Sequence, residues 1–114
     1  HWLANRSETK DYFLELCDAV KDGCARLNKE AKAIHYSNEA DMINRLLLGT
    51  TAKKWLLSKG LSGKLRDHLT LNQLKYLSYL ERTDITFIEL GFDFQQRKEK
   101  LTELFARHMV EKTA

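Results

Sequence analysis

Residues 70–91 read TLNQLKYLSYLERTDITFIELG, and this stretch decides the fold. Thr70 and Gln73 form a capping box, which predicts the start of a helix, and Gly91 is a suitable residue to end it. The apolar residues occupy two helical faces, Leu74, Leu77 and Ile88 on one and Tyr76, Leu80, Phe87 and Leu90 on the other. A helix that is apolar on two sides packs between neighbouring helices. We therefore expect it at the centre of a helical domain, with a loosened turn at the charged run of residues 81–84.

A last helix is predicted on the C-terminal side of this stretch. Asp93 and Gln96 form a second pair of the capping-box kind. The residues expected to face inward recur at helical spacing, and they are Phe94, Leu101, Leu104, Phe105 and Met109. Most basic residues of the segment fall on the opposite side, so we expect an amphipathic helix.

A second helix of the chain is predicted on the N-terminal side. Ser37 or Asn38 is expected to cap it, because both side chains can accept hydrogen bonds from free backbone amides. Its buried stripe consists of Met42, Ile43, Leu46 and Leu47. Gly49 is suited to end it, because glycine adopts positive φ without strain.

Two short helices are predicted between Gly49 and the central stretch. Either threonine of residues 50–51 can begin the first, which carries Trp55. Gly60 is expected to end it at positive φ, with Leu61 folding back onto the helix in a Schellman motif. Another short helix is then expected in residues 62–69.

The first 34 residues are predicted to form one long helix, capped at Ser7 or Thr9. Its apolar residues repeat in a heptad pattern, and they are Phe13, Cys17, Val20, Cys24, Leu27 and Ala31. This seam is compatible with packing inside the domain and with a coiled-coil contact to another chain. Gly23 lies beside the seam, and because glycine costs roughly 1 kcal/mol relative to alanine within a helix, the pattern allows a bend there.

The composition agrees with a single all-α domain. The chain has 114 residues, of which 43% are hydrophobic and 31% charged, with no proline and only five glycines. A β-sandwich would need many more turn residues, and no apolar run is long enough to span a membrane. We therefore expect one compact domain of about six helices with a long N-terminal helix. Because the sequence begins at His1 rather than at Met, we expect a fragment of a longer protein.

Residues that commonly carry out catalysis or bind metals are few and scattered. Cys17 and Cys24 are two turns apart on one helix face, with Cα atoms about 10.5 Å apart, which is too far for a disulfide. The cysteines and the four histidines show no zinc-site spacing, and no phosphate loop or nucleophile elbow occurs. We expect no enzyme activity, no metal and no cofactor, and interpret the cysteines as apolar core residues in a reducing compartment.

One segment is strongly basic. Residues 50–70 contain a single acid, Asp67, and five basic residues, which are Lys53, Lys54, Lys59, Lys64 and Arg66. Such a cluster is either a solvated helix face or a site for nucleic-acid phosphates. A helix-turn-helix in residues 51–70 would usually have a small residue at Leu56 and a buried apolar residue at Arg66. DNA binding through this unit is therefore the alternative hypothesis.

Several segments together resemble a known family. They are NEADMINR at residues 38–45, LGTTAK at 48–53, GL at 60–61, LRDHLT at 65–70, DFQQRK at 93–98 and LTELF at 101–105. In these segments the chain resembles the helical C-terminal region of phage antirepressors and of related prophage proteins of the DNA-damage-inducible protein D group. The resemblance covers residues 35–108 and brings no catalytic motif with it.

The resemblance implies a protein-binding function. Antirepressors bind a phage repressor and relieve transcriptional repression, which places such a protein in the cytoplasm of a bacterial host. We expect the domain to bind a repressor and to form homo-oligomers through its helices. The expected interface residues are Phe13, Cys17, Val20, Cys24, Leu27 and Trp55. Further aromatic residues suited to anchor a partner are Trp2, Tyr12, Tyr36 and Tyr79.

Overall fold

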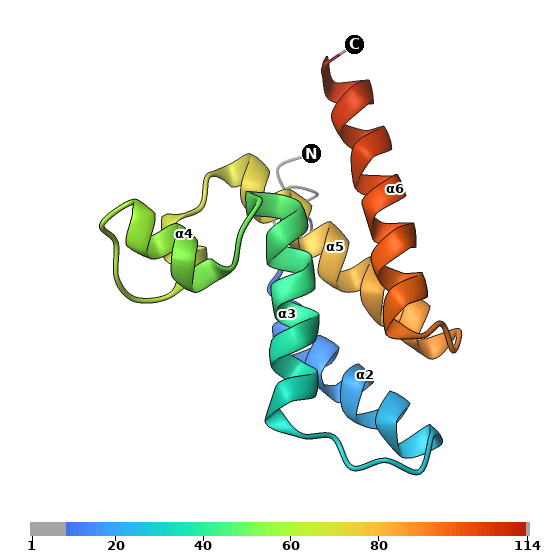
Figure 1. Ribbon diagram of the computed structural model, residues 1–114. Coiled ribbons are helices and arrows are strands. Elements are labelled where there is room, and N and C mark those ends of the chain that lie inside the picture. Colours follow the sequence, from blue (N-terminus) through green and yellow to red (C-terminus); the bar gives the residue numbers. More distant parts are fainter. Residues whose placement is uncertain (1–8, 114) are drawn as a thin grey trace.

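The computed structural model describes residues 9–113, with side chains as far as His108, and its regular elements are all helices (Figure 1). They are α2 (Phe13–Arg26), α3 (Ala33–Leu48), α4 (Ala52–Ser58), the 3-10 helix η1 (Leu65–His68), α5 (Leu71–Glu89) and α6 (Phe94–Thr113). The all-α expectation is confirmed. The described residues hold five α-helices rather than about six, because residues 62–69 form only one 3-10 turn.

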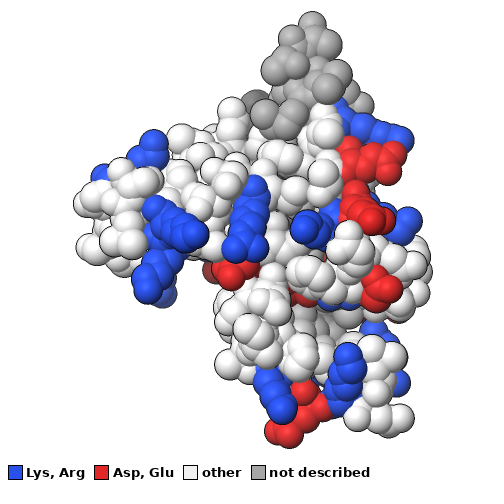
Figure 2. Space-filling model, in the orientation of Figure 1, with Lys and Arg blue, Asp and Glu red and all other residues white. Residues whose placement is uncertain are grey.

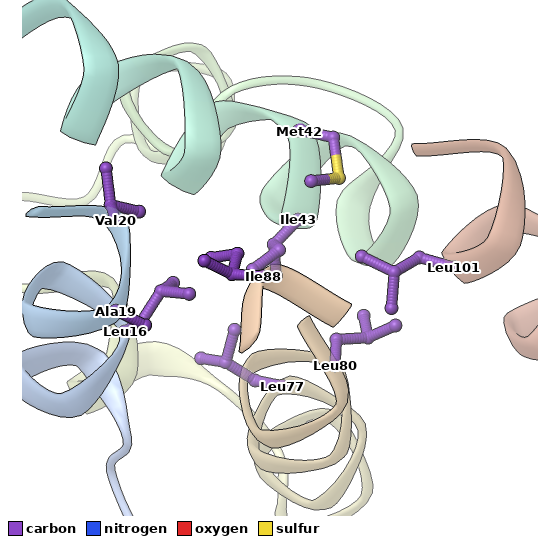
Figure 3. Packing of buried hydrophobic residues seen from close by; sticks show 9 residues of the cluster. All are labelled: Leu16, Ala19, Val20, Met42, Ile43, Leu77, Leu80, Ile88 and Leu101. Carbon is purple, nitrogen blue, oxygen red and sulfur yellow. The ribbon is translucent and has the colours of Figure 1, made fainter. Parts of the chain in front are cut away.

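Helix α5 lies at the centre, as its two apolar faces predict. It packs against α2, α3 and α6, and Figure 1 shows these three helices around it. The core residues come from all four helices, and they are Leu16, Ala19, Val20, Met42, Ile43, Leu77, Leu80, Ile88 and Leu101 (Figure 3). Burying each large side chain contributes about 1.5–3 kcal/mol before the cost of ordering the chain. Helix α5 runs through residues 81–84 without the expected loosened turn.

The prediction of one long N-terminal helix is wrong for the described residues, because α2 ends at Arg26. Asn28 adopts a left-handed conformation with φ of 57°. Its N–H donates to the carbonyl of Ala25, and the N–H of Lys29 donates to the carbonyl of Cys24. These two bonds form a Schellman motif, in which asparagine takes the usual place of glycine. The helix also begins later than expected, after Tyr12, and Ser7 lies outside the described residues.

The buried face of α2 differs from the expected seam. Leu16, Ala19 and Val20 enter the core, whereas Phe13 and Leu27 at the two ends of the seam are exposed. The helix is turned in this way because α5 packs on the side of Gly23. The glycine therefore permits a close helix approach and does not interrupt α2.

Helix α3 begins earlier than the caps Ser37 and Asn38 suggested. Its first residue is Ala33, preceded by the extended Lys32, whose N–H donates to Nδ1 of His35. Because α2 stops at Arg26, the next helix has room to start before Ser37. Ser37 then lies inside α3, where its hydroxyl donates to the carbonyl of Ala33. The end at Gly49 is confirmed, with φ of 80°.

The other local predictions of helix ends are confirmed. Thr70 and Gln73 form the reciprocal bonds of a capping box, and so do Asp93 and Gln96. Gly60 has φ of 67°, and the N–H of Leu61 donates to the carbonyl of Leu56, as a Schellman motif requires. In residues 9–113 no helix combines the length and the apolar character needed to cross a bilayer.

The inward face predicted for the last helix is mostly confirmed. Leu101 is fully buried, and the ring of Phe105 packs edge-on against Tyr76 with centroids 5.3 Å apart. Leu104 is half-buried, whereas Phe94 lies largely at the surface. The side chain of Met109 lies outside the described part.

Candidate functional site

The segment around α4 forms a lobe at the edge of the molecule. We call residues 52–64 the α4 lobe. Helix α4 packs mainly against α3, and none of its residues is buried. Figure 1 shows it projecting to the left of the other helices. A segment with so little core contact is held by its caps, which are the Thr51 hydroxyl bonded to the Lys54 N–H and the Gly60 corner.

The α4 lobe is basic. Its four lysines are exposed, and they are Lys53, Lys54, Lys59 and Lys64. Residues 50–66 contain no acid to balance them. Figure 2 shows blue atoms gathered at the left, where this lobe lies, whereas red atoms on this face lie mostly over the rest of the molecule. Four of the five predicted phosphate contacts are therefore on one lobe.

The same lobe exposes apolar side chains. Leu57 is 69% exposed and Leu61 is also at the surface. Trp55 is half-buried, with the Lys59 ammonium 5.9 Å from the centre of its ring. Exposed apolar side chains beside charged ones occur on surfaces that bind another macromolecule.

Arg66 does not join the four lysines at the surface. Its Nη2 donates to the carbonyl of Thr9 at 2.7 Å, and its other nitrogens lie 3.6 Å from Asp11 and 3.8 Å from Glu81. The guanidinium is thus directed toward the chain before α2 and toward α5. The sequence did not reveal this, because its partners are 15 or more positions away.

Residues 51–70 do not form a helix-turn-helix. Gly63 adopts φ of 92°, so the chain after Gly60 stays irregular until Lys64. Only the four-residue turn η1 follows, where a recognition helix would need several turns. The mismatches at Leu56 and Arg66 agree with the absence of a helix-turn-helix in this segment.

The expected interface seam on α2 is divided between core and surface. Val20 is only 6% exposed and packs in the core. Phe13 and Leu27 are exposed at opposite ends of the helix. Cys17 and Cys24 are half-buried free thiols, and burial together with the charge of Asp18 raises the pKa of Cys17. The seam therefore does not offer a continuous stripe to a partner.

The aromatic residues proposed as anchors are mostly engaged within the domain. Tyr36 and Tyr79 pack against the core, and the Tyr79 ring lies 4.6 Å from the ring of His108. Tyr12 is half-buried, with the Lys10 ammonium 4.9 Å from its ring centre. Trp2 lies outside the described residues. Trp55 is thus the only one of these aromatic residues that the structure places on the α4 lobe.

Two buried acidic clusters were not predicted. In the first, a carboxylate oxygen of Glu81 accepts from the Tyr12 N–H at 3.1 Å, with Arg66 beside it. Burial raises the pKa of Glu81 to about 7, although the Tyr12 N–H and Arg66 oppose this. The Ser78 hydroxyl donates to the carbonyl of Lys10 at 2.5 Å. This cluster fixes the chain before α2 onto α5.

The second cluster joins α3, α5 and α6. Arg97 donates two hydrogen bonds to Glu39, at 2.8 and 2.6 Å, and a third to the carbonyl of Phe92 at 2.7 Å. Asp84, which is fully buried, lies 3.5 Å from the same guanidinium. Burial and the neighbouring Glu39 raise the pKa of Asp84 to about 9, so Asp84 is protonated at neutral pH.

A sequence signal for these acids does exist. Positions 77, 81, 84 and 88 recur at helical spacing, so Glu81 and Asp84 lie on the same face of α5 as the core residues Leu77 and Ile88. The expectation of a loosened turn at residues 81–84 did not take this spacing into account. Buried acids of this kind need partners from other helices, and those partners are set by the tertiary structure.

A groove lies between the α4 lobe and the core. It has a volume of about 400 Å³ and is bounded by α2, α3, η1 and α5. Its apolar walls include Phe13, Leu16 and Leu77, and its polar groups include Arg66 and Glu81. The volume falls within the range of ligand-binding pockets, about 300–1,000 Å³.

Metal ligands do not gather anywhere in the described residues, where no three His, Cys, Asp or Glu side chains are placed to hold one ion. Comparisons with protein-family models, with curated proteins and with solved structures found no match to this chain.

Proposed function

We propose that this domain binds a phage repressor, in the manner of an antirepressor, and that the α4 lobe is its contact surface. The observation that supports this most is the combination of Leu57, Leu61 and Trp55 with four exposed lysines on a lobe that has no buried residue. Apolar anchors at the centre and charges at the rim are the usual arrangement of a protein-binding patch.

The segments that resemble antirepressors support the same surface. LGTTAK at residues 48–53 spans the end of α3 and the start of α4, and GL at residues 60–61 forms the corner that ends the lobe. LRDHLT at residues 65–70 contains η1 and the cap of α5. Half of the matching segments thus lie on the α4 lobe or at its borders.

The lysines suggest the chemistry of the partner. A cluster without acids favours a surface that carries Asp or Glu, because complementary charge steers the two proteins together and excludes basic partners. The apolar residues would then supply most of the affinity, since exposed ion pairs contribute little. The expected repressor surface is therefore acidic around an apolar centre.

The experiment is a calorimetric titration of the domain with the purified repressor of the same phage. Leu57→Ser should weaken binding at least about tenfold, because it removes a central apolar contact worth about 1.4 kcal/mol or more. Leu90→Ser is the matched control, since Leu90 is 64% exposed but lies at the far end of α5. Equal affinities of the two variants, or no binding by the wild type, would contradict the proposal.

We also propose that the domain forms homo-oligomers through α2, but through a smaller contact than the heptad seam suggested. Val20 belongs to the core, so the large exposed apolar residues that remain for a second copy are Phe13 and Leu14 of α2 and Leu27 directly after it. They do not form one stripe, because Phe13 and Leu27 lie at opposite ends of the helix. We therefore infer a contact at one end of α2 rather than a coiled coil.

DNA binding by the α4 lobe is the second candidate. It is favoured by one observation, the four exposed lysines in a segment without acids. If all four neutralised phosphates, the logarithm of affinity would fall with the logarithm of salt concentration with a slope of about −3.6. A labelled duplex titrated at several salt concentrations tests this. A slope near zero, or unchanged binding by Lys53→Glu, would remove the candidate.

A further inference from the structure

The cluster of Arg97, Glu39 and Asp84 lies where three helices meet. Arg97, near the start of α6, donates at 2.8 and 2.6 Å to the carboxylate of Glu39 on α3. Its Nε atom also lies 3.5 Å from Oδ1 of Asp84 on α5. Both acids are buried, and the Arg97 side chain is only 13% exposed. One cation therefore faces two acids at a place that water hardly reaches.

The cation satisfies only one of the two acids. Glu39 accepts both hydrogen bonds from Arg97, whose Nη1 donates instead to the carbonyl of Phe92. Neither oxygen of Asp84 accepts a hydrogen bond from the residues that the structure describes. An ionised carboxylate buried in this way is costly, so Asp84 keeps a proton, which it can donate to Glu39. Burial and, after it, the neighbouring Glu39 raise the pKa of Asp84 to about 9.

The charged groups around Asp84 come from the three helices packed against α5. Glu39 of α3 and Arg97 of α6 act on it directly, and Asp93, which caps α6, acts on Arg97. From α2, Arg26 donates at 2.9 Å to a backbone carbonyl one turn after Asp84. Arg26 is thus directed to the end of α5, and Arg97 is the cation that balances the two acids.

Apolar packing holds α6 less firmly than it holds the other long helices. Among the described side chains, eight of the nine buried core residues come from α2, α3 and α5, and α6 supplies only Leu101. Phe105 and His108 add ring contacts to α5, but both are half-buried. Figure 1 shows α6 at one side of the molecule, joined to α5 by residues 90–93. The buried cluster is therefore a large part of what fixes the start of α6.

We propose that Arg97, Glu39 and Asp84 form a proton-dependent latch, so that loss of the Asp84 proton releases α6 while α2, α3 and α5 stay packed together. With α6 docked, Asp84 is neutral and Arg97 balances the charge of Glu39. When α6 leaves, Arg97 is withdrawn and water reaches Asp84, which then ionises as an ordinary aspartate does. Docking of α6 therefore takes up one proton. Release uncovers Leu80 and Leu101, both fully buried, so the loss of a proton is converted into exposed apolar surface.

The latch weakens as the pH rises. Between about pH 4 and 9 Asp84 is protonated when α6 is docked and ionised when α6 is released, so each pH unit favours release about tenfold. Amide hydrogen exchange of the complete ¹⁵N-labelled chain measures this opening. At Leu101 and Phe105 we expect the opening constant to rise about tenfold per pH unit between about pH 6 and 8. The amides of Leu16 and Leu80 should open at least about tenfold less often at each pH, because they exchange only when the whole domain unfolds.

Two variants test whether the proton belongs to this cluster. Asp84→Asn has nearly the shape of the protonated acid and can still donate to Glu39, so α6 should stay docked and its opening constant should no longer depend on pH. In Glu39→Gln, Asp84 can ionise beside Arg97, so the pH dependence should again be largely lost. Glu81→Gln is the matched control, because Glu81 is a buried acid of α5 that is bonded to Tyr12 and not to α6. It should leave the tenfold change per pH unit of the α6 amides intact.

Three results would overturn the proposal. If the amides of α6 open with the same constants as those of Leu16 and Leu80, α6 is released only by complete unfolding. If their opening constant does not change with pH, release frees no proton. If the tenfold change per pH unit persists in Asp84→Asn or in Glu39→Gln, the proton belongs to another group.

Discussion

Gly23 of α2 faces Ile88 of α5 so closely that a Cβ atom at Gly23 would lie 3.0 Å from Cγ2 of Ile88. This is tighter than nine in ten real Cβ contacts, and Ile88 is buried, so it has little room to move. The glycine therefore sets the distance between the two helices that share most of the core. The low helix propensity of glycine matters less at this position than the close approach of α2 and α5 that it permits.

Gly23→Ala should lower the free energy of unfolding by about 1 kcal/mol. Alanine gains about 1 kcal/mol in helix propensity, but overpacking against Ile88 costs about 1–3 kcal/mol. Urea denaturation measures the difference. In the Ile88→Ala background the clash is absent, so the same substitution should become stabilising. A stabilising Gly23→Ala in the wild-type background would show that Ile88 yields without cost.

Arg97→Met should destabilise the domain by about 3–5 kcal/mol, because it leaves the buried Glu39 carboxylate without its partner. Arg107→Met is the matched control. Arg107 forms a 2.7 Å ion pair with Glu103, but both side chains are more than 60% exposed, so the loss should stay below about 1 kcal/mol. Thermal unfolding of the two variants at one pH compares them, and similar losses would contradict the importance of the buried cluster.

Stability should fall as pH rises from about 4 toward 9. The pKa of Asp84 is about 9 in the folded chain, and an ordinary aspartate in the unfolded chain titrates near 3.9. Between these values the folded state holds a proton that the unfolded state has lost, so raising the pH favours unfolding. Glu81, with its pKa of about 7, adds to the decline in the lower part of this range.

Asp84→Asn tests the source of that pH dependence. Asparagine has nearly the same shape and cannot ionise, so the decline between pH 7 and 9 should become much shallower. Glu81→Gln should instead make the decline shallower only between about pH 4 and 7, where Asp84 still contributes. Unfolding free energies measured across this pH range separate the two contributions. A wild-type profile that rises with pH would show that these carboxyl groups are ionised in the folded chain.

Gly60→Val should cost at least about 1 kcal/mol, since Gly60 has φ of 67° and a β-branched residue is poorly tolerated there. The open space around Gly60 means that backbone strain is the cause and not a clash. Gly60→Asn is the control, because asparagine enters the left-handed region more readily. The melting temperatures of both variants test this prediction. An unchanged melting temperature for Gly60→Val would show that the positive-φ corner at Gly60 does not contribute to stability.

Leu27→Asp should reduce self-association if the exposed end of α2 contacts a second copy. Leu27 is 67% exposed and follows the last residue of the helix, so the substitution should leave the core intact. Sedimentation equilibrium of wild type and variant provides the measurement. A wild-type chain that stays monomeric at high micromolar concentration would contradict oligomer formation through α2.

The sequence by itself determined the local structure of this protein. The boxes at Thr70 and Asp93 and the glycine corners at residues 49, 60 and 91 depend on side chains and backbone angles within a few residues of each other, and all of them form. The central position of α5 could also be predicted from the sequence, because two apolar faces require helices on both sides.

The tertiary structure alone decided which groups meet. Val20 rather than the whole heptad seam enters the core because α5 packs on the Gly23 side of α2. Arg66 leaves the lysine cluster because Asp11 and Glu81, distant in sequence, lie close to it in the fold. Tertiary structure also places a guanidinium near each buried acid, with Arg66 3.8 Å from Glu81 and Arg97 3.5 Å from Asp84.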